Sequence, residues 1–218
     1  MMHDDLKTAP TSAMAVHSER VQSLVRALHA HWGEARRGDD VPYRAHIDPR
    51  RIAPLLPNVF VAERIAPGVT RLRIAGMHLS ELMGMEVRGM PLSSFIAPAS
   101  REVFALHIVD LFDRPAVLRM DLQARSGPGQ PRVRGTLVML PLRSDLGDVS
   151  RALGCLVTTG PTGRTPCRFD ILEARVTPVT QLDATGGQAA LRVLPGGRGD
   201  TANPCAPRPA RAHLRIVT

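Results

Sequence analysis

The stretch "NVFVAERIAPGVTRLRIAG", residues 58–76, contains two apolar runs that flank a turn dipeptide. Pro67-Gly68 is a pair that punctuates turns. In the second run Leu72 and Ile74 alternate with arginines, which is typical of a strand with one buried and one solvated face. The stretch therefore predicts two neighbouring strands and puts a sheet at the centre of the fold.

The chain that follows these strands predicts helices and then three more strands. Short helical turns are expected over 77–95, where glycines and Pro91 interrupt the chain, and a longer helix over 98–112. Strands are predicted at 115–125, 132–142 and 151–159, with "SGPGQP" (126–131) as a loop. This order predicts an α+β fold, a five-stranded antiparallel sheet with helices on one face.

The chain before the two strands predicts an amphipathic helix over 15–38. Its apolar positions recur at the three- and four-residue spacing of one helix face: Val21, Leu24, Val25, Leu28 and Trp32. We expect residues 1–14 to be a disordered leader, residues 39–177 to form the domain, and 178–218 to be a disordered tail rich in Gly, Pro and Arg.

The composition argues against several classes of protein. The formal net charge is +8, but the basic residues are scattered arginines with Lys7 as the only lysine, and aromatic residues make up 3%. Nucleic-acid binding is therefore not expected. The three cysteines have no metal-like spacing. With no signal peptide and no run of 18 apolar residues, we expect no membrane span and a cytoplasmic protein.

Three blocks of the sequence resemble a single-domain bacterial PAS-like family of largely unknown function, found mostly in alphaproteobacteria. They are "HWGEARRGDDVPYRAHIDPRRIAPLLPNVFVAER" (31–64), "RLRIAGMHLSELMGMEVRGMPLSSF" (71–95) and "LPLRSDLGDVSRALG" (140–154). The chain departs from the family pattern at Tyr43, where a serine is usual, while Ala75 occupies a position where the family tolerates either small residue. The resemblance implies a PAS fold and a role in sensing or regulation, but no particular ligand.

A PAS domain typically binds a ligand between its sheet and the helices, here around 76–112. The resemblance therefore makes pocket candidates of Leu82, Met83, Phe95, Phe104, His107 and Ile108, with plain core packing as the alternative. Haem would need an axial ligand such as His107 or His78, and a lone histidine is more often a satisfied or surface residue. Flavin is suggested only by "PCRFD" (166–170), which we expect to lie away from any pocket. No cofactor is predicted.

No enzyme is predicted, because no serine or cysteine has a base and an acid at a diagnostic spacing. Metal binding by His29, His31, His46 and Asp48 is not favoured, since side chains two apart on a helix diverge by about 200°. Arg36 and Arg37 suggest a cyclic-dinucleotide reader, but the turn motif that should accompany them is incomplete.

The segment 31–49, which we call the clasp, holds the only Trp and the only Tyr. We interpret it as a structural link between the first helix and the sheet, built on Trp32, Pro42, Arg44, Asp48 and Pro49. Trp32 is expected to bury its ring and leave its indole N–H outside. Asp48 and Pro49 are expected to start a short helix.

The sequence therefore predicts a sensory or regulatory protein that acts through contacts with a separate protein, since we recognise no effector module in it. The alternative is a sensor that binds a small ligand such as a nucleotide or haem in the PAS pocket. A homodimer is expected, with Val21, Leu24, Val25 and Leu28 at the interface. The other reading of that stripe, packing against the chain's own sheet, stays open.

Overall fold

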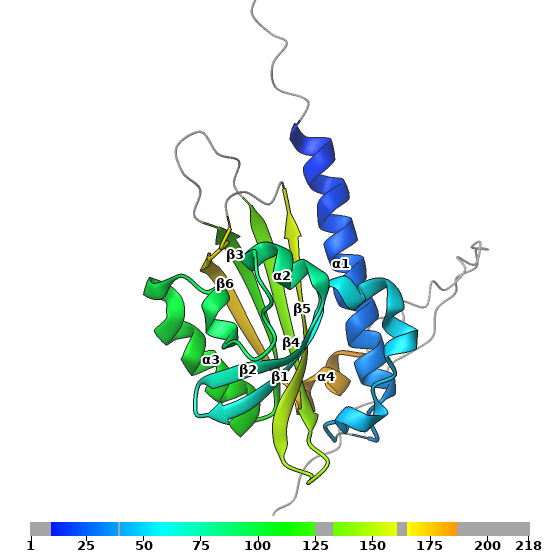
Figure 1. Cartoon of the computed structure of the whole chain (residues 1–218). Coiled ribbons are helices and arrows are strands. Elements are labelled where there is room, and N and C mark those ends of the chain that lie inside the picture. Colours follow the sequence, from blue (N-terminus) through cyan, green and yellow to red (C-terminus); the bar gives the residue numbers. More distant parts are fainter. Residues whose placement is uncertain (1–9, 39, 125–132, 161–164, 187–218) are drawn as a thin grey trace, which may run out of the picture.

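The computed structural model describes residues 10–38, 40–124, 133–160 and 165–186. One antiparallel sheet of six strands forms its centre, in the order β2-β1-β5-β4-β3-β6 (Figure 1). The strands are β1 (Val59–Ala66), β2 (Val69–Ala75), β3 (Ala116–Ala124), β4 (Arg134–Arg143), β5 (Val149–Thr159) and β6 (Phe169–Pro178). The predicted α+β class is confirmed.

Helices cover both faces of this sheet. On the first, which we call the helix face, lie α2 (Met77–Met83), α3 (Arg101–Asp113) and the 3-10 turns η3 (Leu92–Phe95) and η4 (Pro98–Ser100). On the second, the clasp face, lie α1 (Pro10–Glu34), η2 (Pro49–Asn58) and α4 (Val179–Gly186). The single turn η1 (Arg44–His46) sits in the clasp. In Figure 1, α3 and α1 stand on opposite sides of the strands.

The expectation of helices on one face only is wrong, and β4 shows why. Eight consecutive residues of this strand, Gly135–Leu142, are buried, so both of its faces are covered. On the clasp face, Val138, Leu140 and Leu142 join the cluster that contains Leu28 and Trp32 of α1. A strand buried on both sides is apolar throughout rather than alternating.

The sheet also has one strand more than predicted. β6 pairs with β3 along its whole length, with a register shift where Leu172 is the extra residue. A bulge of this kind reverses the side-chain alternation, so the period-2 pattern of residues 169–178 is broken. The extra residue Leu172 therefore removes the alternation by which the strand could have been recognised in the sequence.

The helix boundaries at both ends differ from the predicted ones. α1 runs over Pro10–Glu34 instead of 15–38, and the predicted tail begins with the helix α4. Residues 1–9 of the predicted leader, residues 187–218 of the predicted tail and the "SGPGQP" loop lie outside the described residues. No helix among the described residues is long and apolar enough to cross a membrane.

Two glycines leave room for close contact between neighbouring elements. A Cβ at Gly76, which links β2 to α2, would lie 2.1 Å from the carbonyl oxygen of Leu56. A Cβ at Gly154 of β5 would lie 2.2 Å from the ring of Phe60 on the neighbouring strand. Both glycines belong to the blocks that carry the family resemblance, and their role is packing.

Candidate functional site

The first and third of the resembling blocks meet on the clasp face, which makes this region a candidate functional site. Trp32 is fully buried, and its Nε1–H donates to the carbonyl oxygen of Pro141 on β4 at 2.8 Å. The expectation that the indole N–H would lie outside is therefore wrong. A carbonyl in the middle of the sheet accepts the hydrogen bond, because α1 packs directly on β4.

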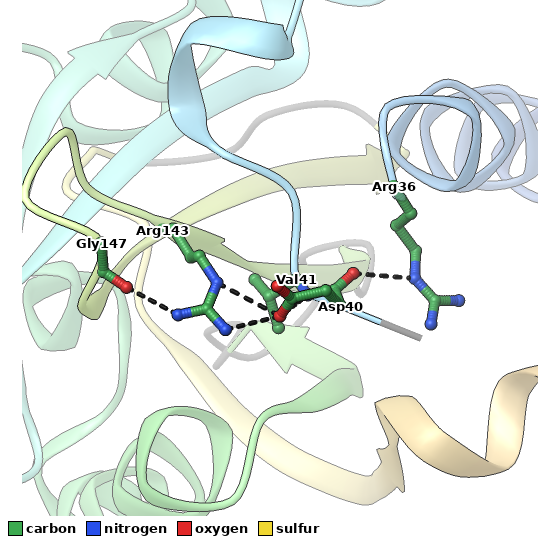
Figure 2. Close-up of polar contacts among 5 residues, drawn as sticks. All are labelled: Arg36, Asp40, Val41, Arg143 and Gly147. Carbon is green, nitrogen blue, oxygen red and sulfur yellow. Dashed lines mark hydrogen bonds and ion pairs between the residues drawn. The ribbon is translucent and has the colours of Figure 1, made fainter. Parts of the chain in front are cut away.

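A second link joins the clasp to the hairpin between β4 and β5 (Figure 2). The Arg143 guanidinium donates to Asp40 Oδ1 from Nη2 at 2.5 Å and from Nε at 3.2 Å, and to the Gly147 carbonyl from Nη1 at 2.6 Å. The Arg143 backbone N–H donates to the carbonyl of Pro42 at 2.9 Å. The guanidinium hydrogen bond lowers the pKa of Asp40, and Asp40 in turn raises the pKa of Arg143.

Arg36 belongs to the same arrangement. Its Nε donates to the backbone carbonyl of Asp40 at 3.2 Å, and its guanidinium lies 5.3 Å from the centre of the Trp32 ring. A cation over an indole face is a favourable contact. Arg36, considered above as a reader of cyclic dinucleotides, here connects the end of α1 to the clasp (Figure 2).

The far end of the clasp is anchored by Asp48. Its carboxylate accepts from the backbone N–H of Arg50 at 2.9 Å and caps η2, whose first residue is Pro49. Its own N–H donates to Nε2 of His31 at 3.2 Å. The predicted start of a short helix at Asp48-Pro49 is confirmed, and no metal-binding group of His, Cys, Asp and Glu occurs among the described residues.

The remaining clasp residues lie along the hairpin. Pro42 is buried, Arg44 is half-buried in η1, and Tyr43 forms an isolated parallel bridge with Arg143. In the hairpin itself Ser144 hydrogen-bonds the Asp148 carboxylate, which lowers the pKa of Asp148, and Gly147 has a φ of 93°. These contacts tie the segment to the sheet, which supports the interpretation of 31–49 as a clasp.

The stripe proposed for dimerisation is largely used by the chain itself. Leu28 is fully buried and Val21 is 8% exposed, both in the clasp-face cluster with β4 and β5. Leu24 and Val25 pack against the same cluster and stay half-exposed. Of the four stripe residues proposed for the interface, only Leu24 and Val25 are therefore more than slightly exposed.

The predicted pocket residues lie together on the helix face. Leu82 and Met83 come from α2, Phe95 from η3, and Phe104 and Ile108 from α3, and all five belong to one buried hydrophobic cluster. His107 of α3 is half-buried, and its Nδ1 is a buried atom without a hydrogen-bond partner among the described residues. Leu82, Met83, Phe95, Phe104 and Ile108 form part of the core, and a pocket among them stays a prediction.

Cys167 of "PCRFD" is closer to this cluster than expected. Its N–H donates to the carbonyl of Leu82 at 2.8 Å, and the side chain is buried in the helix-face cluster. The expectation that this motif would lie away from the predicted pocket is therefore wrong. Burial raises the pKa of the Cys167 thiol, and it raises the pKa of Cys155 on the other face to about 12.

One polar arrangement had no signal in the sequence. His78 at the start of α2 shares a hydrogen bond of 2.9 Å between its Nε2 and Oγ1 of Thr158, and its Nδ1 lies 3.6 Å from Glu81. The order of hydroxyl, imidazole and carboxylate resembles that of a hydrolase, but 3.6 Å is too long for a hydrogen bond. Burial lowers the pKa of His78, and its hydrogen bond to Thr158 holds α2 to β5.

A second unpredicted feature is a hollow of about 490 Å³ beside the edge of β2. Its lining consists of Leu72, Arg73, Glu86, Arg88, Gly89 and Arg151. Arg73 and Arg151 both pair with Glu63, which lies between them on β1. The Nε of Arg151 is buried with no hydrogen-bond partner among the described residues. The register of β1, β2 and β5 brings Arg73, Glu63 and Arg151 together, and the connection after α2 adds Glu86, Arg88 and Gly89, so no local sequence pattern indicates the hollow.

A match to one family model places most of the described chain within a known family. The model of a family described as "PAS domain" matches residues 20–157. Among solved structures, the light-state LOV domain of the blue-light photoreceptor Aureochrome1 is 11% identical, with a TM-score of 0.35, over 48% of this chain and 83% of that one. No curated protein matches the chain. The matched segment runs from α1 to β5 and includes the clasp, both blocks that meet there and all of the helix-face cluster that precedes Cys167.

Proposed function

Since the chain belongs to the PAS domain family, whose members serve in sensing and regulation, we propose that this protein regulates by contact with another protein. The family accounts for the sensory or regulatory role. The mode of action is the new element, and with it we propose that the protein is not an enzyme and works without a bound cofactor.

One observation carries this proposal. The region where a PAS ligand was expected is filled by the chain's own side chains, since Leu82, Phe95 and Phe104 are each at most 1% exposed. Protein interiors are packed at close to crystal density, and a ligand of ordinary size needs a few hundred Å³. A signal that does not enter between sheet and helices has the surface as its remaining route.

The decisive experiment is affinity capture from the cells that encode the chain, with chemical cross-linking before lysis and native mass spectrometry of the captured material. We expect a second polypeptide in a fixed ratio, a chain mass without added ligand, and no absorbance in the haem or flavin bands. A small molecule bound one to one, with no second polypeptide, would contradict the proposal.

The hollow beside β2 favours a second candidate, a sensor for a small anion. Arg73, Arg88 and Arg151 face a space within the range of small-ligand sites, while Glu63 neutralises part of their charge. Arginine forks suit phosphate and carboxylate groups. A phosphate-bearing molecule is the ligand class that these residues would hold best.

This second candidate is tested by thermal unfolding with inorganic phosphate or pyrophosphate against chloride at equal ionic strength. Binding predicts a higher unfolding temperature in pyrophosphate that is lost in Arg88→Gln and kept in Arg50→Gln, an exposed arginine on η2. Equal unfolding temperatures in all three salts would rule the anion site out and leave the first proposal untouched.

A further inference from the structure

The strand β6 ends the sheet, and the described residues leave part of its outer edge without a strand partner. Among the described residues, the segment at Ile96 and Ala97 approaches this edge, where Ala97 N–H donates to the Phe169 carbonyl at 2.8 Å. The sheet order and the isolated bridges of the described chain give no neighbour for the stretch Leu172–Val176. A row of unpaired backbone groups on an edge strand is a template for pairing with another strand.

The register with β3 determines which backbone groups face that edge. Val179 N–H donates to the carbonyl of Pro115 at 2.9 Å, so these two residues form a hydrogen-bonded pair. Arg175 pairs with Arg119 and Glu173 with Asp121, and both lie an even number of residues before Val179. Hydrogen-bonded and non-bonded pairs alternate in an antiparallel ladder. Arg175 and Glu173 therefore bond inward to β3, and the amide and carbonyl groups of Ala174 and Val176 point outward.

We propose that Leu172–Val176 pairs antiparallel with the same segment of a second copy of this chain, about a twofold axis at Ala174. In that register Ala174 faces its own copy with both outward groups bonded, and Leu172 faces Val176 of the second copy. Glu173 and Arg175 lie one residue to either side of the axis, so Glu173 of each copy faces Arg175 of the other copy. The segment is its own complement, as a twofold interface requires.

The charges of the segment fit this pairing. Within one chain Arg175 Nε already donates to Glu173 Oε1 at 2.7 Å, and the two side chains are 72% and 53% exposed. In the pair, each carboxylate would lie beside two guanidinium groups, and charges of opposite sign would alternate around the axis. Cross-strand pairs of opposite charge stabilise a sheet, and like charges directly opposite weaken it.

The edge is short, which determines the kind of dimer. The bulge at Leu172 and the contact at Phe169 limit the strand on one side, and Pro178, which has no N–H to donate, limits it on the other. Leu172, 55% exposed, supplies the main apolar contact. Interfaces below about 1,200 Å² are typical of weak, reversible complexes, so the dimer should dissociate on dilution. This inference does not rest on the proposed function.

Sedimentation velocity of the full chain over a concentration series tests the pairing. The wild-type chain should pass from monomer to dimer as the concentration rises. Glu173→Arg and Arg175→Glu should each raise the dissociation constant at least about tenfold, equal to about 1.4 kcal/mol. An equimolar mixture of these two variants should dimerise again, because one chain presents two arginines and the other two glutamates. Ala174→Pro should abolish pairing by removing the central donor.

Asp145→Arg, a charge reversal on the exposed loop between β4 and β5, is the matched control and should dimerise as the wild type does. Two results would overturn the inference. One is a wild-type chain that stays monomeric throughout the series. The other is a dimer that survives Ala174→Pro and both charge reversals, since such a dimer uses another surface. Neither result bears on whether a different protein is captured in cells.

Discussion

The two faces of the sheet are both buried, and they are covered in different ways. The helix face holds four fully buried phenylalanine rings, Phe60, Phe95, Phe104 and Phe169, under helices that follow β2 directly in the chain. The clasp face is mainly aliphatic with a single tryptophan, and the segment over it is held by directional bonds such as Trp32–Pro141 and Asp40–Arg143. The polar residues concentrated in 31–49 thus mark an attachment between distant parts of the chain.

The largest expected effect, a loss of unfolding free energy on removal of a buried ring, should be the same on both faces. Trp32→Ala and Phe104→Ala each remove a fully buried ring, and each should lower the free energy of unfolding by about 3–5 kcal/mol. Urea denaturation followed by circular dichroism measures both. A loss below about 1 kcal/mol for Trp32→Ala, with the full loss for Phe104→Ala, would mean that α1 contributes little to the fold.

Milder substitutions should affect the stability of the two faces differently. Trp32→Phe keeps an aromatic ring but leaves the Pro141 carbonyl without its donor, which should cost about 1–3 kcal/mol. Phe104→Leu on the helix face alters shape without disturbing a hydrogen bond, and it should cost about 1.5 kcal/mol or less. The same denaturation assay applies. If Trp32→Phe is as stable as the wild type, the indole hydrogen bond is not what holds the clasp.

The link through Asp40 should matter less, because it is exposed. The side chains of Asp40 and Arg143 are 57% and 29% exposed, and such pairs contribute about 0–1 kcal/mol. Asp40→Ala should therefore destabilise slightly at low salt and by less at about 1 M salt, where charges are screened. Asp145→Ala in the same hairpin is the control. A salt-independent loss above about 2 kcal/mol would show that the link is more than a surface ion pair.

The smallest expected effect is that of pH, through one histidine on each face. Burial lowers the pKa of both His29, beside Trp32, and His78, below the ordinary 6.5. The unfolded chain then takes up protons before the folded one, so stability should fall as the pH drops through about 6.5. Urea titrations at pH 7.5 and about 5.5 measure this. His29→Gln and His78→Gln should each flatten the dependence, and an unchanged slope in both would assign it to other groups.

The parts of the fold that follow a local pattern could be predicted from the sequence. The turn at Pro67-Gly68, the alternation in β3 and the cap at Asp48 each depend on neighbouring residues, and each occurs where expected. Whether the first helix covers the clasp face or forms a dimer was left open, although β4 carries the signal for a covered face, an unbroken apolar run. That run should have indicated a strand buried on both sides.

The candidate site could be predicted less well, for a physical reason. The clasp segment was chosen for its residue types, but its partners Pro141 and Arg143 lie on a strand far along the chain, and only strand order brings them near. The pairing of Glu63 with Arg73 and Arg151, which line the hollow, depends on the register of β1, β2 and β5. Cys167 reaches α2 through a connection that has no periodic pattern.

The bond from Trp32 to Pro141 spans 109 residues of sequence, and this has a consequence for synthesis. The first helix leaves the ribosome long before the strand that receives it exists. At about 5–20 residues per second, the interval is roughly 5–20 s. Throughout that time Leu28 and Trp32 can meet η2 but not β4, so α1 completes its native packing only after β4 has been made.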